Sequence, residues 1–150
     1  MITVKNLKKS FGDNEVLKGI DYEIKQGEKI VIIGPSGSGK STLLNMLAGI
    51  ERPSSGEVYI GKYRIDNLSE SDLAKFRQKF TGFIFQSYNL LPTMTALENV
   101  ALPLMFKGVG KEEREQRAME MLKLVGIDNR YKHKPKEMSG GQQQRVGIAR

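Results

Sequence analysis

Residues 34–41 read Gly-Pro-Ser-Gly-Ser-Gly-Lys-Ser, and this stretch decides the fold class. Its spacing fits the phosphate-binding pattern G-x-x-x-x-G-K-[ST]. The glycines let the backbone curl so that successive N–H groups point inward and form a nest for an anion. Lys40 would bring a mobile positive charge to the β- and γ-phosphates, and the Ser41 hydroxyl would reach Mg²⁺. The motif predicts binding of a nucleoside triphosphate.

The sequence on either side supplies the context that such a loop requires. Residues 29–33, Lys-Ile-Val-Ile-Ile, form a short β-branched run, which predicts a strand buried on both faces. After the loop, the apolar residues between Leu43 and Ala48 follow helical spacing, and Gly49 ends the predicted helix. The alternative is an ordinary Gly/Ser loop, but a chance match in a chain this long has odds of about one in two hundred.

The rest of the chain alternates strands and helices in its first half and is mostly helical after residue 95. Apolar patterning predicts strands at residues 2–4, 16–24, 58–60 and 82–85. Capping motifs at Ser69–Asp72 and Thr95–Glu98 predict helices over 73–79 and from 97 onward, the second kinked or ended by Pro103. Further helices are predicted over 112–125 and from Ser139, with a subdomain boundary near 87–94.

Composition excludes several functional classes. The 150 residues contain 24 Lys and Arg against 17 Asp and Glu, a net charge of +7, with one His and no Cys. The lack of cysteine excludes disulfides, thiolate metal sites and cysteine nucleophiles and fits a reducing cytoplasm, and the single histidine excludes multi-histidine sites. No apolar run approaches the length of a membrane span. The positive charge could mark a nucleic-acid surface, but the basic residues are scattered, so no nucleic-acid partner is expected.

A second candidate phosphate contact is Ser139-Gly140-Gly141-Gln142. Ser139 followed three positions later by Gln142 is a capping box, which could be its whole role. Two glycines in the first turn, however, destabilise a helix by about 1 kcal/mol each relative to alanine. They make sense if something approaches the backbone closely, and a bare helix N-terminus beside a serine hydroxyl is a receptor for a γ-phosphate. The pattern by itself leaves both interpretations open.

Three motifs in this order closely resemble the ATP-binding-cassette (ABC) ATPases: residues 34–42, Phe85–Gln86, and 138–145 (Met-Ser-Gly-Gly-Gln-Gln-Gln-Arg). Residues 82–100 look most like the branch that drives lipoprotein release and macrolide-type export. The resemblance implies an α/β P-loop NTPase fold, with a RecA-like core, an antiparallel β-subdomain and an α-helical subdomain, incomplete at the C-terminus. Residues 1–86 would form the β-subdomain and part of the core, 87–94 the linker after Gln86, and 95–150 the helical subdomain with the signature helix.

The resemblance also implies roles for single residues. Phe11 falls where the family, more often with tyrosine, stacks an aromatic ring on adenine, although it could be an edge aromatic packed on the β-subdomain. Gln86 would reach Mg²⁺ and the attacking water, although it could simply cap a strand end. The implied catalytic residues are Lys40, Gln86 and Ser139, and the implied metal ligands are Ser41 and Gln86. The nucleotide contacts would be Phe11, Val16, Gly34, Ser36, Gly37, Ser38, Gly39, Lys40, Ser41, Thr42, Gln86, Ser139, Gly140, Gly141 and Gln142.

The function that the resemblance implies is that of the ATP-binding subunit of an ABC transporter. Two copies would associate head to tail with ATP and Mg²⁺ between the glycine loop of one and the Ser139 helix of the other, and would drive a transmembrane permease. The protein would be cytoplasmic and peripheral on the inner face of the cell membrane, which it would touch only through the permease. Two alternatives remain at this point: a non-catalytic nucleotide-dependent interaction module, and a soluble ABC protein acting on nucleic acid.

The family pattern continues beyond Arg150 with an apolar strand ending in Asp-Glu and, later, a histidine. The aspartate would hold Mg²⁺ through water, the glutamate would be the general base, and the histidine would contact the γ-phosphate. His133 precedes the signature and is interpreted as a solvated loop residue. We therefore expect residues 1–150 to bind ATP without turning it over, and to be a piece of a longer cassette or to be completed by another chain. Two strands of the parallel sheet would be missing between 29–33 and 82–85.

Overall fold

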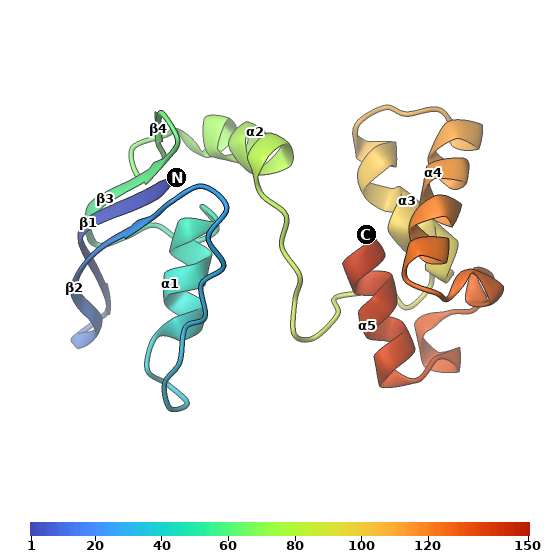
Figure 1. Cartoon of the computed structure of the whole chain (residues 1–150), viewed down its shortest axis with the longest axis horizontal. Helices are drawn as coiled ribbons and strands as arrows, with labels where there is room; N and C mark the ends of the chain where they lie inside the picture. Colours follow the sequence, from blue (N-terminus) through green and yellow to red (C-terminus); the bar gives the residue numbers. More distant parts are fainter. The chain divides into compact units, whose positions relative to one another are not determined.

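The structure is a computed structural model that describes all residues 1–150 and divides into two compact units, Met1–Phe83 and Ile84–Arg150. Residues 87–94, expected to be a linker, lie within the second unit. The first unit contains β1 (Ile2–Phe11), β2 (Asn14–Ile24), α1 (Lys40–Leu47), β3 (Ser55–Ile60), β4 (Tyr63–Arg64) and α2 (Glu70–Phe80) (Figure 1). The second contains α3 (Ala96–Phe106), α4 (Lys111–Leu124), the 3₁₀ turns η1 (Asp128–Arg130) and η2 (Pro135–Glu137), and α5 (Gly140–Ala149).

The first unit is built on a four-stranded antiparallel sheet with the order β2-β1-β3-β4. Val4 and Leu7 are both buried although they are three residues apart, a spacing that would place them on opposite faces of a regular strand. A register shift between these two residues, with Asn6 at φ 45°, brings both side chains to the same face. This irregularity allows β1 to contribute two large side chains to one core.

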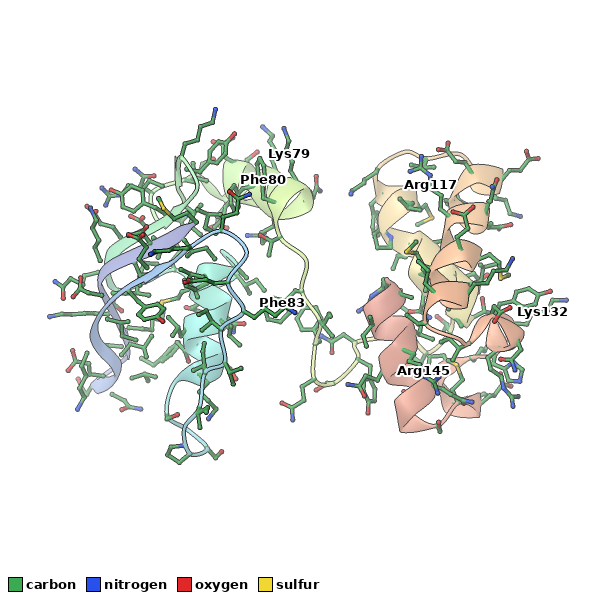
Figure 2. All side chains as sticks on the ribbon, viewed as in Figure 1. Lys79, Phe80, Phe83, Arg117, Lys132 and Arg145 are labelled. Carbon is green, nitrogen blue, oxygen red and sulfur yellow. The ribbon has the colours of Figure 1, made fainter.

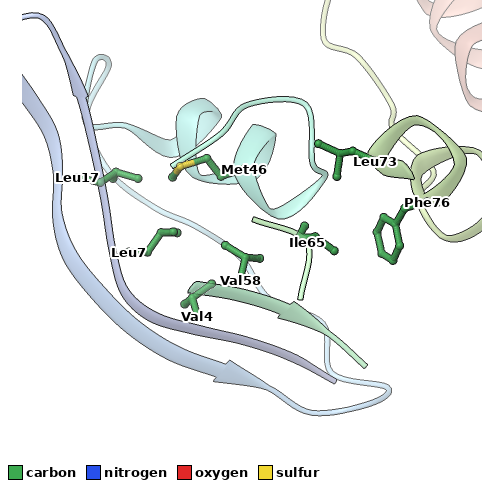
Figure 3. Packing of buried hydrophobic residues seen from close by; sticks show 8 residues of the cluster. All are labelled: Val4, Leu7, Leu17, Met46, Val58, Ile65, Leu73 and Phe76. Carbon is green, nitrogen blue, oxygen red and sulfur yellow. The ribbon is translucent and has the colours of Figure 1, made fainter. Parts of the chain in front are cut away.

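That core lies between the sheet and the helices α1 and α2. Leu73 and Phe76 follow helical spacing on α2, which begins where the capping motif predicts: the Ser69 hydroxyl accepts a hydrogen bond of 3.1 Å from the Asp72 amide. Apolar side chains of α1 and α2 therefore cover the inner face of the sheet. The buried cluster consists of Val4, Leu7, Leu17, Met46, Val58, Ile65, Leu73 and Phe76 (Figure 3).

The second unit packs α3, α4 and α5 around a separate core that includes Val100, Leu122 and Val146. The predicted capping box is present at the start of α3, where the Thr95 amide donates to Glu98 Oε2 at 2.7 Å. Pro103 was expected to kink or end this helix, but α3 continues to Phe106. Proline cannot donate a backbone hydrogen bond, but its carbonyl still accepts from the Lys107 amide at 3.3 Å, which continues the last turn. None of the helices combines the length and apolar character needed to cross a bilayer.

The strands predicted at 29–33 and 82–85 are not formed. A strand requires a neighbour that satisfies its N–H and C=O groups, and the only ladders present are the antiparallel ones among β1 to β4. The prediction that residues 29–33 are buried on both faces is therefore wrong for this structure: the exposed fraction is 79% for Val31 and 90% for Ile33. Residues 30–33 instead line an apolar cavity of 370 Å³ whose other walls are β1, β2 and α1.

Candidate nucleotide-binding site

The glycine loop runs directly into α1, and the junction leaves several backbone donors free. Gly39 is the N-cap of α1 with φ 87°, a left-handed conformation that glycine adopts without steric penalty, and no side chain caps the helix. The first backbone bond is donated by the Leu43 amide to the Gly39 carbonyl, at 2.8 Å. The amides of residues 40–42 therefore have no acceptor within the helix, and they are the groups with which a helix N-terminus binds an anion.

Lys40 places its ammonium against the backbone of this loop. Its Nζ donates to the carbonyls of Gly34 at 2.9 Å and Pro35 at 2.6 Å, and lies 3.4 Å from Ser38 Oγ. The Ser38 amide closes the turn by donating to the Pro35 carbonyl at 3.3 Å. A mobile cation next to acceptor-free amides is a donor set that fits a polyphosphate.

Two glycines of the motif have close neighbours, and the positive φ of Gly39 adds a backbone reason for glycine there. A Cβ on Gly34 would lie 2.7 Å from Ser38 Oγ. A Cβ on Gly39 would lie 2.9 Å from a methyl of Leu17 and 3.0 Å from a methyl of Val16. The loop thus packs directly on β2, and Val16 is in contact with the end of the glycine loop.

Phe11 lies at the end of β1, on the hairpin that also carries Val16. Half of its surface is exposed, and the Lys9 ammonium lies 4.7 Å from the ring centroid. Lys9 is itself fixed by an ion pair with Glu51 and a bond of 2.8 Å to the Arg52 carbonyl. A half-exposed aromatic ring can stack on a planar base.

The second unit contains the other predicted residues. Ser139 caps α5 as predicted: its hydroxyl accepts from the Gln142 amide at 3.3 Å, and its own amide donates to Gln142 Oε1 at 3.0 Å. A Cβ on Gly140 would lie 3.2 Å from the Tyr88 hydroxyl, whereas one on Gly141 would meet nothing within 4 Å. One glycine therefore makes room for a neighbour in this chain, and the other leaves the helix start bare. Gln86 is exposed in the same unit.

His133 is not the fully solvated residue that the sequence suggests. Its Nδ1 is buried without a hydrogen-bond partner, and its Nε2 lies 3.1 Å from a guanidinium nitrogen of Arg130. Its carbonyl accepts from the Ala96 amide at 2.8 Å, which ties the loop to the start of α3. The residue is therefore part of the packing of the second unit.

Sequence reasoning missed Tyr88, Asn99 and Arg150, which connect the segment after Gln86 to the helices. Asn99 is fully buried, and Arg150 bonds the backbone of residues 88 and 89. The sequence contained one usable signal, because an asparagine adjoining the apolar stripe of a predicted helix must find hydrogen-bond partners if it is buried. Nothing local in the sequence marked the other two.

Comparison with known proteins agrees with these features. A family model described as ABC transporter matches residues 17–150. An uncharacterised ABC transporter ATP-binding protein of Thermotoga maritima is 52% identical over 136 residues, which are 91% of this chain and 58% of that protein. The lipoprotein-releasing system ATP-binding protein LolD of Bacteroides thetaiotaomicron is 47% identical over 150 residues, covering 100% of this chain and 69% of LolD. The macrolide export ATP-binding/permease protein MacB of Marinobacter nauticus is also 47% identical, with 24% of it covered.

Among solved structures, the dimeric post-hydrolysis state of the ATP-binding cassette MJ0796, bound to ADP and Pi, matches with a TM-score of 0.91 and 46% identity. The match covers 99% of this chain and 68% of that one, and it confirms the P-loop NTPase fold class. The chain thus spans 58% of the Thermotoga relative and 69% of LolD. Since the family model, the relatives and the fold all agree, the chain belongs to the ABC transporter family, as an ATP-binding domain.

Proposed function

We propose that residues 1–150 are the ATP-binding part of an ABC transporter ATPase of the lipoprotein-release and macrolide-export type. The observation that carries this proposal is the uncapped start of α1, whose amides at residues 40–42 have no acceptor within the helix, together with the Lys40 ammonium bonded to two carbonyls of the same loop. The names of the relatives, which are transporter ATP-binding proteins, favour transport over an interaction module or a nucleic-acid protein. The complete subunit would lie on the inner face of the cell membrane and drive a permease there.

Each part of the site has a chemical task in this proposal. The amides of the loop and Lys40 would bind the β- and γ-phosphates, and Ser41 with Gln86 would hold Mg²⁺. The magnesium ion, when bound, would neutralise charge on the phosphate oxygens. Phe11 and Val16 would receive the adenine ring. The start of α5, with Ser139 and the bare Gly141, would face the nucleotide held by a second copy, so each site needs two subunits.

Full-length members of this family are ATPases, but for residues 1–150 alone we propose binding without turnover. The Asp-Glu pair and the histidine that the family resemblance places after Arg150 are not among these residues. Lys40 and Ser139 would still stabilise charge on the phosphates, yet no residue assigned here would take a proton from the attacking water. Hydrolysis would therefore require a general base from outside residues 1–150.

The proposal is tested by titrating the chain with Mg·ATP in a calorimeter. Lys40→Ala should lower the affinity about tenfold or more, because a hydrogen bond to a charged group contributes roughly 1.5–3 kcal/mol. Lys107→Ala is the matched control, since Lys107 is exposed in the second unit and its removal changes the net charge equally. Binding of equal strength in the wild type and Lys40→Ala, or no heat with either, would contradict the proposed function.

A further inference from the structure

The two residues after Ser87 have an unusual backbone conformation. Tyr88 has φ 58° and Asn89 has φ 49°, so two consecutive non-glycine residues are left-handed. This conformation is disfavoured by about 1–2 kcal/mol per residue, and it persists only where surrounding contacts impose it. The turn is tight, with the Tyr88 amide bonded to the Phe85 carbonyl at 3.2 Å and the Asn89 amide to the Ser87 carbonyl at 2.6 Å.

Arg150 supplies the contacts that impose this conformation. Its Nη1 donates to the Asn89 carbonyl at 2.6 Å, and its Nη2 donates to the Tyr88 carbonyl at 3.0 Å. The planar guanidinium presents two parallel N–H groups, and these match the two adjacent carbonyls of the left-handed pair. One side chain, at the end of the signature helix, therefore fixes both strained residues.

Tyr88 also lies close to two glycines of the same helix. A Cβ on Gly140 would lie 3.2 Å from the Tyr88 hydroxyl, and a Cβ on Gly147 would lie 3.6 Å from its carbonyl oxygen. Tyr88 therefore extends along α5 from the first turn, next to Ser139, to the last turn, where Arg150 follows. Tyr88 is thus close to Gly140 and Gly147 of α5, and its carbonyl is bonded by Arg150.

The far end of the segment is fixed to α3. Asn99 is fully buried, and its Oδ1 accepts from the Leu91 amide at 2.8 Å. Its Nδ2 donates to the carbonyls of Leu91 at 3.2 Å, Met94 at 3.2 Å and Thr95 at 3.0 Å. Side chains from two helices thus hold the backbone of residues 88–95 at both ends.

We propose that Arg150 is a positioning residue, which joins the segment beginning at Gln86 to the signature helix, so that Gln86 and Ser139 are carried by one rigid body. The inference rests on the proposed function, in which these two residues contact nucleotide. A displacement of Gln86 by the nucleotide would then be passed to Ser139 through the Tyr88 and Asn89 carbonyls and Arg150.

The test is nuclear magnetic resonance on the chain without nucleotide. Arg150→Lys keeps the charge, but a single ammonium cannot present the parallel pair of donors. Exchange of the Tyr88 and Asn89 amide protons should accelerate about tenfold or more, because two charge-assisted bonds are weakened. Residual dipolar couplings of residues 86–95 and α5 should fit one alignment tensor in the wild type and no longer do so in the variant. Arg145→Lys, at an exposed arginine of the same helix (labelled in Figure 2), should change neither quantity.

A rescue variant separates positioning from general packing. Asn89→Gly in the Arg150→Lys background should restore slow exchange in part, because glycine adopts positive φ without strain. If Arg150→Lys only disturbed the packing, Asn89→Gly would not slow the exchange, because this substitution adds no contact. The proposal is overturned if amide exchange in Arg150→Lys is unchanged, or if Asn89→Gly does not slow the accelerated exchange. It is also overturned if the amides throughout α3 exchange equally fast, because Arg150 would then be a general structural residue.

The outcome is independent of the calorimetric test, since no nucleotide is present. Failure to bind Mg·ATP would overturn the proposed function and leave the attachment of residues 88–95 to α5 intact. Unchanged exchange would overturn the positioning role and leave ATP binding intact.

Discussion

At the residue scale, β1 approaches β3 so closely at Gly56 that no side chain fits between them. Gly56 has φ 95°, and a Cβ there would lie 2.3 Å from the Asn6 carbonyl oxygen, a backbone atom that cannot rotate away. Gly61 also has a positive φ, 56°, but a Cβ there would meet nothing within 4 Å. A side chain would therefore clash at Gly56 and would find open space at Gly61, although both positions need a left-handed backbone.

Gly56→Ala should lower the free energy of unfolding of the first unit by about 3 kcal/mol or more, because it adds a backbone clash to the strain. Gly61→Ala should lower it by only about 1 kcal/mol, the cost of positive φ. Urea denaturation followed by circular dichroism measures both. Equal losses in the two variants would show that the close approach at Asn6 is relieved by movement of the strand.

At the element scale, α3 and α5 begin with capping boxes that differ in charge. The Thr95 amide and hydroxyl both donate to the Glu98 carboxylate, and these bonds lower the pKa of Glu98 below its ordinary value of 4.5. The corresponding residue of α5 is Gln142, which does not titrate. A lowered pKa in the folded state means that stability is present above the ordinary value and is lost as the pH falls through the lowered pKa.

Glu98→Gln should therefore lower the stability of the second unit at pH 7 and reduce its loss on acidification below pH 4.5. Glutamine keeps an acceptor and Glu98 is largely exposed to solvent, so the expected change at pH 7 is only about 0.5 kcal/mol. Thermal unfolding at neutral and acidic pH measures the effect, with Gln142→Glu as the reciprocal variant that should gain pH dependence. A Glu98→Gln profile parallel to that of the wild type would contradict this assignment.

At the scale of the whole molecule, the exposed apolar segment at residues 30–33 should govern association. Its backbone forms no hydrogen-bonded ladder, and Val31 exposes 79% of its surface, so it offers both apolar area and unpaired backbone groups to another chain. Val31→Lys should shift the chain toward monomer in light scattering after size exclusion, with little change in unfolding. Leu124→Lys is the matched control, because Leu124 is 77% exposed but lies on α4, whose backbone is already bonded. Equal shifts in both variants would point to added charge as the cause.

The sequence by itself determined the features that depend on residues close together in the chain. The glycine loop with the start of α1, the capping boxes at Thr95 and Ser139, and the strands predicted at 2–4 and 16–24 are all present. Their hydrogen bonds join residues a few positions apart, or strands that follow each other, so the pattern of side chains is sufficient to predict them.

Which predicted strands form, and what surrounds α5, depends on contacts between residues that are far apart in the sequence. The β-branched run at 29–33 has the composition of a buried strand, yet it forms no ladder, because a strand depends on a neighbour that its own residues do not specify. Arg150 bonds Tyr88, 62 positions away, and the hydroxyl of the same tyrosine approaches Gly140. Contacts over such distances arise from the packing of the helices, and no local pattern in the sequence predicts them.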